Sequence, residues 1–299
     1  MASVAQQATS DAAVIPFRRP EREALRYHAG KFQLAHWIIE HLAPHRQYVE
    51  PYGGAMSVLL QKEPAEIEIY NDCDSRVVDY FDVLRDHVAA ARLRQLLQLT
   101  PFHPAELELS GEWHHDPVER ARRLVVRTFM SRTTEALLID GVPGFRSCVG
   151  RSGASTAREW AALPDHLEAI TQRLRLVAFK RSDALDVIAK CDTPDTLIFV
   201  DPPSLPDARA TARQRSRRAF RADMPVADHR ALLQALRGSE GMVVLAAQES
   251  ELYDRMLAGW TKYRPPASLD PNRAKMDTLW LNPLAESRRP SPSLFGALK

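Results

Sequence analysis

The sequence predicts an α/β fold built on a parallel β-sheet, and three observations lead to this prediction. Residues 48–85 follow the order strand, loop, helix, strand, helix, which is typical of parallel strands joined by helical crossovers. Residues 196–200 form a continuous apolar run, as buried parallel strands do. Acidic residues stand at the ends of three expected strands, namely Glu50, Asp72 and Asp201, where open α/β sheets bind their ligands.

The first half of the sheet is expected before residue 86. Apolar residues recur at helical spacing over residues 31–42, which predicts a helix ahead of the first strand. Residues 48–50 predict that strand, and the proline and glycine pair after it predict a tight loop before a helix at 55–61. Residues 67–70 predict the second strand, which is followed by a helical pattern at 75–85.

The middle of the chain has a different composition. Helical patterns cover residues 89–99 and 117–130, and a stretch rich in glycine, serine, threonine and arginine follows at residues 131–155. A loop of that length is uncommon unless it serves a function. We therefore expect an inserted, mostly helical subdomain over residues 86–162.

The second half of the sheet is expected after this insertion. Its predicted helices are 163–174, 184–190, 227–236 and 250–258, and its predicted strands are 176–180, 196–200, 241–246 and 278–281. The α/β domain then comprises residues 23–85 and 163–283. Residues 1–22, rich in Ala, Gln, Ser and Arg-Pro, are expected to form a flexible arm, and the Pro- and Ser-rich residues 284–299 a flexible tail.

The composition of the 299 residues is ordinary for a soluble globular protein, with 45% hydrophobic and 26% charged residues. It excludes a chain that is disordered throughout, a collagen and a coiled coil. The sequence has no run of about 18 apolar residues, so no membrane span is expected. The N-terminus also lacks the pattern of a secretory signal.

The cysteines and histidines predict neither a disulfide framework nor a metal site. Cys73, Cys148 and Cys191 are far apart and form no CxxC pair, so a reduced, cytoplasmic setting is expected. His114 and His115 are adjacent, and neighbouring side chains point apart on a helix or strand. We expect no bound metal.

The arginines are clustered although the net charge is only +2. Residues 209–221 contain six arginines, and residues 120–132 contain five arginines and no acidic residue. Such a cluster is either a solvated helix face or a set of phosphate contacts, because the guanidinium fork matches phosphate oxygens. For the cluster that follows Asp201 we favour phosphate contact. The candidate residues are Arg213, Arg215, Arg217, Arg218, Arg132, Arg146 and Arg151.

The first two strand ends are suited to a nucleoside. Gly53 and Gly54 follow the first strand, and Asp72 lies at the end of the next one. An acidic residue at about this distance from a glycine turn suits a ribose, because a carboxylate accepts hydrogen bonds from both hydroxyls. No GxGxxG or GxxxxGK[ST] motif for phosphates is present. These features point to S-adenosylmethionine, although an ordinary α/β turn with cap residues would share them.

The third strand end carries the residues that could perform chemistry. Asp201, Pro202 and Pro203 directly follow the apolar run. Because proline fixes φ and has no N–H, this loop is rigid and presents two acceptors, the Asp201 carboxylate and the Pro202 carbonyl. Two acceptors that hold the hydrogens of an exocyclic purine amine can aim its lone pair at a methyl sulfonium, by positioning and electrostatics rather than by proton abstraction.

With these motifs in order, the chain resembles the D12 class of DNA adenine-N6 methyltransferases, the Dam-like family that is common in phages and prophages. Residues 50–58 (Glu-Pro-Tyr-Gly-Gly-Ala-Met-Ser-Val) resemble the family's first S-adenosylmethionine motif, and residues 27–31 its N-terminal cofactor motif. Residues 71–72 (Asn-Asp) resemble the ribose motif, residues 201–203 the catalytic DPPY tetrapeptide, and residues 279–283 the last strand. The resemblance runs from about Tyr27 to Pro283.

The resemblance implies a Rossmann-like S-adenosylmethionine-dependent methyltransferase domain, with residues 86–162 as an inserted target-recognition subdomain. It implies methyl transfer to N6 of an adenine that is flipped out of double-stranded DNA at a specific short site. Lys31 would pair with the methionine carboxylate, Asp72 would hold the ribose, and Asp201 would face the target amine. The other residues implied at the cofactor are Tyr27, Glu50, Pro51, Gly53, Gly54 and Asp183. We expect a monomer or weak dimer, and a restriction partner is left open.

The sequence departs from the family at several positions near this site. Ser204 stands where the family has an aromatic that stacks on the flipped base, Met56 stands in the glycine loop where it would crowd the cofactor, and Gln248 replaces a usual tyrosine. Two explanations fit these departures. Either Phe220 or Phe145 stacks in place of the missing aromatic, or a catalytically impaired homologue binds DNA, cofactor or a partner subunit without turnover. Methylation of RNA or of another amine is a third alternative.

Overall fold

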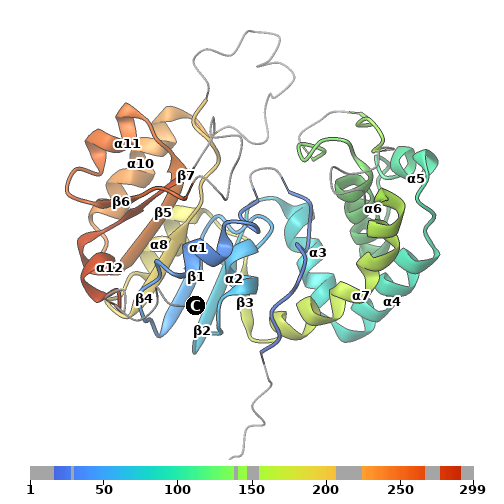
Figure 1. The fold of residues 1–299 in the computed structure, drawn as a ribbon, viewed down its shortest axis with the longest axis horizontal. Helices are drawn as coiled ribbons and strands as arrows, with labels where there is room; N and C mark the ends of the chain where they lie inside the picture. The colour runs from blue at the N-terminus through green and yellow to red at the C-terminus, as the bar shows by residue number, and fades with distance from the viewer. Residues whose placement is uncertain are drawn as a thin grey trace, which may run out of the picture.

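A seven-stranded sheet forms the larger lobe of the molecule (Figure 1), in the strand order β3-β2-β1-β4-β5-β7-β6. The computed structural model describes residues 17–27, 30–137, 141–146, 155–206, 224–266 and 277–290. Its strands are β1 (Gln47–Glu50), β2 (Ile67–Asn71), β3 (Val177–Lys180), β4 (Thr196–Val200), β5 (Met242–Gln248), β6 (Thr261–Tyr263) and β7 (Asp277–Leu281). β1 to β5 pair in parallel, and β7 and β6 complete the sheet antiparallel. The predicted α/β fold is confirmed.

Strand β1 lies at the point where the chain reverses its direction of travel across the sheet. From β1 the chain moves to β2 and β3 on one side, and it then returns to place β4 and β5 on the other side. Gln47 therefore pairs with Ile67 of β2 and with Thr196 of β4. Loops that leave the carboxyl ends of two such strands diverge and open a crevice. The residues that follow β1 and β4 are thus brought to one place.

Helices cover both faces of the sheet. One face of the sheet shares an apolar core with α1 (Ala35–Ile39), α2 (Ser57–Gln61) and α3 (Ser75–Arg85). The opposite face shares a second apolar core with α8 (Ala184–Cys191), α10 (Val226–Arg237) and α11 (Glu251–Met256). Side chains of β4 alternate between the two cores. Leu197 and Phe199 belong to the first core, and Ile198 and Val200 to the second. The unbroken apolar run of β4 is explained because successive strand residues face opposite layers and both layers are buried.

The inserted segment forms a second, helical lobe that packs beside α3 (Figure 1). It contains α4 (His87–Leu99), α5 (Pro104–Leu109), α6 (Pro117–Met130) and α7 (Thr156–Leu174). α4 and α6 each begin at an aspartate whose side chain accepts backbone N–H bonds of the first turn, which stabilises a helix start. α7 runs through residues 162 and 163, so the expected end of the insertion does not coincide with a break in secondary structure.

A buried ion cluster fixes α7 to the sheet. Glu68 of β2 accepts hydrogen bonds from Lys62 Nζ at 2.7 Å and from Arg173 Nη2 at 2.8 Å, and Arg173 also donates to the Leu59 carbonyl at 2.8 Å. All three charged side chains are at most 4% exposed. Two cations around one carboxylate compensate for the loss of solvation, and this explains how ionic groups are tolerated between two layers.

The other expected helices and strands are confirmed, with differences at their ends and some elements that were not predicted. The helix expected over 31–42 is only α1, and the helix expected from residue 163 begins seven residues earlier as part of α7. α5 and β6 were not predicted. α12 (Pro283–Arg288) occupies the start of the expected tail, because the Asn282 side chain accepts from the backbone N–H of Ala285 and so begins a helix there. Residues 1–16 and 291–299 lie outside the described residues.

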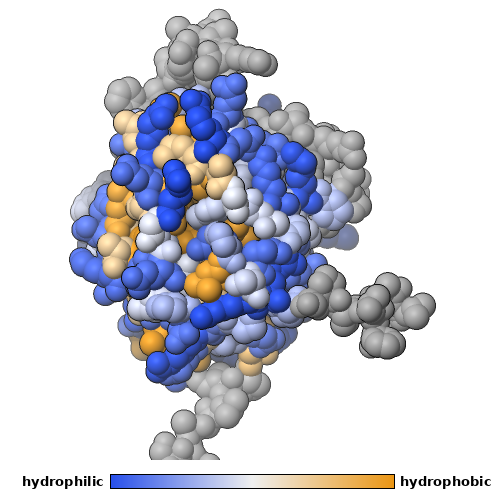
Figure 2. Space-filling model, turned by 90° about the vertical axis from the view of Figure 1, so that its left-hand side faces the viewer, coloured by the Kyte–Doolittle hydropathy of each residue, from blue (hydrophilic) through white to orange (hydrophobic). Residues whose placement is uncertain are grey.

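Large apolar side chains at the surface are scattered rather than gathered. Among the described residues, the clearly exposed ones come from different parts of both lobes, namely Ile67, Val88, Leu99, Trp113, Val142, Leu176 and Val226. On the side of the molecule shown in Figure 2, hydrophobic residues form small patches among hydrophilic ones. None of the helices in the described part of the chain has the length and apolar character needed to cross a membrane.

Candidate active site

The carboxyl ends of β1, β2 and β3 are joined by one buried side chain, Asn71. Its Nδ2 donates to the carbonyls of Pro51 at 2.9 Å and Ser182 at 3.1 Å, and its Oδ1 accepts from the Ser182 amide at 2.9 Å. Asn71 is the last residue of β2 and is 1% exposed. From the sequence, Asn71 was identified only through the resemblance of residues 71–72 to the ribose motif. An amide directly before an acidic strand end was the signal that could have indicated this role.

The loop after β1 requires glycine at two positions. A Cβ at Gly53 would lie 2.0 Å from the ring of the fully buried Tyr70, and Gly54 has a φ of +47°. The Gly53 amide donates to the Asn71 carbonyl, and Tyr70 Oη donates to the Gly54 carbonyl, both at 2.8 Å. These bonds hold the loop against β2, and because Gly53 and Gly54 have no side chain, a ligand can approach the backbone of the loop closely.

The side chain of Met56, which was expected from the sequence to crowd the cofactor, lies in the apolar core. Its backbone has a left-handed conformation, with φ 57° and ψ 31°, and its amide donates to the Gly53 carbonyl. The side chain is fully buried and belongs to the main apolar core. The left-handed turn therefore directs a large side chain into the core, where the family pattern would place a small residue.

Asp72 faces the glycine loop with both oxygens used by backbone amides. Oδ2 accepts from Gly54 N at 2.8 Å, and Oδ1 accepts from Asp74 N at 2.7 Å. Burial raises the pKa of this carboxyl, although the two amide bonds oppose the shift. Tyr27 packs on the same loop, since a Cβ at Gly54 would lie 3.2 Å from its ring. Each carboxylate oxygen has a second lone pair with which it could accept from a ligand hydroxyl.

An ion pair joins the N-terminal segment to the end of β4. Lys31 Nζ lies 2.9 Å from Asp201 Oδ1, and the side chains are 5% and 25% exposed. The next residue, Pro202, is buried, whereas Pro203 and Ser204 are exposed. The carboxylate of Asp201 is thus held at the strand-order reversal between β1 and β4 with its charge balanced by a buried ammonium.

Glu50 lies under this site rather than at its surface. It is 2% exposed, and its Oε1 accepts hydrogen bonds from Tyr48 Oη and from the Leu59 amide, each at 2.8 Å. Burial is the main cause that raises its pKa to about 8, and the nearby charge of Asp201 acts in the same direction. Glu50 therefore connects the end of β1 to α2.

Replacing Glu50 with Gln is expected to remove a pH dependence of stability. The pKa of Glu50 is about 8 in the folded protein and has its ordinary value of 4.5 in the unfolded chain. Between these two pH values the folded protein keeps a proton that the unfolded chain has lost, so the free energy of unfolding falls as the pH rises. Across this window the wild type should lose on the order of a few kcal/mol relative to the variant, whose amide oxygen can accept the same two bonds. Urea unfolding at pH 5 and pH 8.5 measures this, and parallel pH curves for the two proteins would contradict it.

Asp183 and Tyr52 line the β2–β3 side of the site. Asp183 is exposed and begins α8, where its Oδ1 accepts from Leu185 N at 2.8 Å. Tyr52 is half-buried, and burial raises the pKa of its hydroxyl, with Asp183 the largest charge contribution. Tyr52 was missed by the sequence analysis, since an aromatic within a glycine loop has no periodic signal.

The structure describes only part of the expected phosphate-binding set. Arg132 is exposed, but Arg146 Nη2 is paired with Glu159 Oε2 at 2.8 Å. Phe145 is half-buried and packs on Phe102 with ring centroids 4.9 Å apart, and its stacking in place of the missing aromatic stays a prediction. The other expected residues lie outside the described ranges, namely Arg151, Arg213, Arg215, Arg217, Arg218 and Phe220.

No metal centre is indicated in the part of the chain that the structure describes, where no group of three potential ligands occurs. Cys73 is exposed and Cys191 is buried, each with a free thiol. His114 and His115 were expected to point apart, but their rings stack with centroids 4.4 Å apart. They are adjacent in a loop rather than on a regular helix or strand, so the alternation does not apply.

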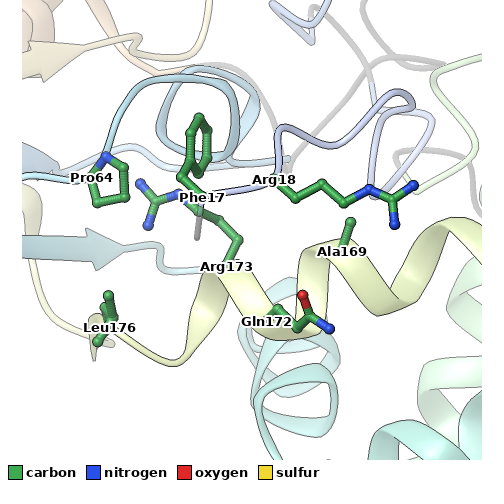
Figure 3. Close-up of a pocket in the computed structure, with 7 residues that line it drawn as sticks. All are labelled: Phe17, Arg18, Pro64, Ala169, Gln172, Arg173 and Leu176. Atoms are coloured by element: carbon green, nitrogen blue, oxygen red, sulfur yellow. The ribbon is translucent and has the colours of Figure 1, made fainter. Parts of the chain in front are cut away.

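A small cavity lies against α7, away from the strand ends that form the site (Figure 3). Its lining residues are Phe17, Arg18, Pro64, Ala169, Gln172, Arg173 and Leu176. Pro64 precedes β2 and Leu176 precedes β3, so the cavity is at the amino ends of these strands. At about 20 Å³ it has room for roughly one water molecule, and it cannot hold a nucleoside.

Comparison with known families agrees with this geometry. A model of the D12 class N6 adenine-specific DNA methyltransferases matches residues 27–258, which include the glycine loop, the helical insertion and Asp201. The match ends before β6, so the expected likeness of residues 279–283 to the family's last strand lies beyond it. No curated protein matches the chain. The match covers well over half of the sequence, and the chain therefore belongs to the D12 class of N6 adenine-specific DNA methyltransferases.

Proposed function

We propose that this protein transfers a methyl group from S-adenosylmethionine to N6 of an adenine that is flipped out of double-stranded DNA. Methyltransferases of the D12 class use S-adenosylmethionine as the methyl donor. The observation that carries the proposal is the pair of Lys31 and Asp201, held 2.9 Å apart at the end of β4 beside the glycine loop. It supplies a cation for the cofactor and an acceptor for the amine at adjoining positions.

The residues present fit S-adenosylmethionine, which supplies an electrophilic methyl group on a positively charged sulfur. Lys31 is a buried ammonium that can bind the methionine carboxylate. Asp72 retains lone pairs for the ribose hydroxyls, as its two amide bonds fix its orientation. Tyr27 packs over the glycine loop, and Asp183 lies on the side expected for the adenine. The bare backbone of Gly53 and Gly54 permits close approach.

The chemistry of the chain's own residues is positioning. The Asp201 carboxylate and the Pro202 carbonyl can each accept one hydrogen of the adenine amine, which leaves the nitrogen lone pair directed away from both. Proline at positions 202 and 203 limits the backbone, so the two acceptors stay in place without reorganisation. The base has to leave the duplex to reach Asp201, since N6 is paired within the helix.

We infer that the helical lobe, with residues 86–162, is the target-recognition subdomain. The segment from Ser131 to Arg146 follows α6, and it contacts Arg26 and Arg76 through the carbonyls of Ser131 and Leu137. Residues 138–140 of this segment lie outside the described ranges. Arg132 is exposed on this segment and can reach phosphate or base edges. Loss of DNA affinity in Arg132→Ala with unchanged cofactor affinity is the expected result.

The enzyme is tested by incubating it with S-adenosylmethionine carrying a tritiated methyl group and DNA that lacks adenine methylation. Label recovered as N6-methyldeoxyadenosine supports the proposal. A parallel incubation with RNA in place of DNA, in which the RNA but not the DNA becomes labelled, would favour the alternative substrate. Binding of cofactor and DNA without transfer, in a folded protein, would favour the catalytically impaired homologue.

Replacing Ser204 with Tyr is expected to raise the rate of methyl transfer. Ser204 is exposed directly after the two prolines, where a ring could stack on the flipped base. Stacking is worth about 1–3 kcal/mol, which corresponds to a rise of about 5- to 150-fold. The matched control is Ser287→Tyr, on the exposed surface of α12, which should leave the rate unchanged. An unchanged rate in Ser204→Tyr would show that the missing aromatic does not limit this enzyme.

A further inference from the structure

Two arginines join the cofactor segments to the segment from Ser131 to Arg146, which is called the recognition segment below. We propose that Arg26 and Arg76 are positioning residues that make the binding of cofactor and of DNA cooperative. The inference rests on the proposed function, because it takes Tyr27, Lys31 and Asp72 as cofactor residues and the recognition segment as the DNA reader.

Arg76 connects the ribose-binding end of β2 to the recognition segment. Its Nε and Nη2 form a fork on Asp74, at 3.0 Å and 2.6 Å, and its Nη1 donates to the Leu137 carbonyl at 3.1 Å. The Asp74 amide in turn donates to Asp72 Oδ1 at 2.7 Å. The guanidinium is planar and rigid, so a carboxylate held on one edge fixes where the other edge points. The position of Leu137 thus depends on the orientation of the Asp72 loop.

Arg26 connects the N-terminal cofactor segment to the start of the recognition segment. Its Nη1 donates to the Ser131 carbonyl at 2.8 Å. The next residue, Tyr27, packs on Gly54, and Lys31 pairs with Asp201. Ser131 pairs with Phe145 in an isolated β-bridge, so the bond from Arg26 acts on the base of the recognition segment, where its two ends meet.

A third arginine holds the same segment from within the helical lobe. Arg127 of α6 donates from Nε to the Ala136 carbonyl at 2.9 Å and from Nη2 to the Gly141 carbonyl at 2.7 Å. The recognition segment is therefore anchored to its own lobe by Arg127, and to the two sides of the cofactor site by Arg26 and Arg76. The latter two bonds cross between the lobes, and they are the ones that can transmit cofactor binding.

The physical cause of the cooperativity is shared ordering. A ligand that fixes Tyr27, Lys31 and Asp72 also fixes the two guanidinium groups, and through them the carbonyls of Ser131 and Leu137. DNA then binds a segment that is already ordered, and less conformational entropy is lost in the second step. Because the coupling is reciprocal, DNA must raise the affinity for cofactor by the same factor.

The test measures this factor in the full-length wild-type protein and in two variants. Calorimetry gives the Kd of S-adenosylhomocysteine, which cannot donate a methyl group, with and without sheared DNA from a host that lacks adenine methylation. We expect DNA to lower the Kd of S-adenosylhomocysteine for the wild type by about 5-fold or more. The double variant Arg26→Lys, Arg76→Lys keeps both charges but loses the fork of Arg76 on Asp74 and the guanidinium bonds to Ser131 and Leu137. Its factor should fall close to one.

The control is Arg120→Lys, in helix α6 of the helical lobe. Arg120 donates to the carbonyls of His114 and His115 and lies 3.6 Å from Asp79 of α3, so it makes bonds of the same kind without contacting the recognition segment. This variant should retain the wild-type factor. A second measurement needs no variant, because S-adenosylhomocysteine alone should slow amide hydrogen exchange in residues 131–137 of the wild type.

Each outcome decides a different question. A factor of one in wild type, a double variant that keeps the wild-type factor, or exchange in residues 131–137 that is unaffected by S-adenosylhomocysteine would overturn the inference while the proposed function stands. A wild-type protein that binds neither S-adenosylhomocysteine nor DNA would overturn the proposed function itself. The loss of the factor in the double variant alone, with slowed exchange in wild type, establishes Arg26 and Arg76 in this role.

Discussion

Replacing Asp201 with Asn is expected to lower the rate of methyl transfer to DNA by at least about 100-fold, the effect of removing one preorganised polar group from a transition state. Asn has nearly the same shape, but its amide group turns a donor toward the hydrogens of the adenine amine. The ammonium of Lys31 would lose the carboxylate that lies 2.9 Å away, so the affinity for S-adenosylmethionine should stay equal or rise. Single-turnover transfer of tritiated methyl measures the rate, and calorimetry measures the affinity.

The control for this variant is Asp195→Asn. Asp195 precedes the amino end of the same strand, its side chain is 73% exposed, and its nearest cation, Arg288, is 3.7 Å away. A change of charge there should leave the transfer rate as it is in wild type. A rate in Asp201→Asn within about fivefold of wild type, where catalytic effects of such groups are normally far larger, would remove this carboxylate from the mechanism.

Replacing Gly53 with Ala is expected to destabilise the protein by about 3 kcal/mol and to abolish cofactor binding. The added Cβ would overlap Tyr70 at 2.0 Å. The ring cannot move aside, because Tyr70 is fully buried and packs against Phe81 and Phe179 with centroids 5.5 Å and 5.2 Å away. The loop would have to shift, and the amide bond from Gly54 to Asp72 would be lost with it.

Urea unfolding and calorimetry with S-adenosylmethionine test this prediction, with Gly144→Ala as the control. A Cβ at Gly144 meets no atom within 4 Å, so this substitution should change stability by less than about 0.5 kcal/mol. Equal stability of the two variants would mean that the β1 loop is not packed against Tyr70 as described.

The sequence predicted most of the sheet because its signal is local. The run at residues 196–200 must be a strand buried on both faces, and the glycine pair after β1 must be a tight loop. These patterns depend only on near neighbours in the chain. The acidic residues at the strand ends were identified for the same reason. The resemblance to the D12 class was confirmed separately, by the family match to residues 27–258.

Elements with little periodic signal were missed or misjudged. β6 has three residues and pairs antiparallel with β7 at the edge of the sheet. A run this short carries no periodic signal that marks a strand. The side chain of Met56 is directed by a left-handed backbone, which sequence composition does not predict at a non-glycine residue. From the sequence, Phe145 was a candidate to stack on a base, and its contact with Phe102 became known only from the fold.

The sequence by itself determined the class of fold, the order of its elements and the chemical types at the strand ends. Only the tertiary structure decided which of these groups meet. Lys31 contacts Asp201, and Arg26 and Arg76 reach the recognition segment, across separations in the chain that carry no local pattern. The physical reason is that periodicity reports which side of an element is buried, whereas a contact between distant residues depends on the crossovers and lobe packing that bring their elements together.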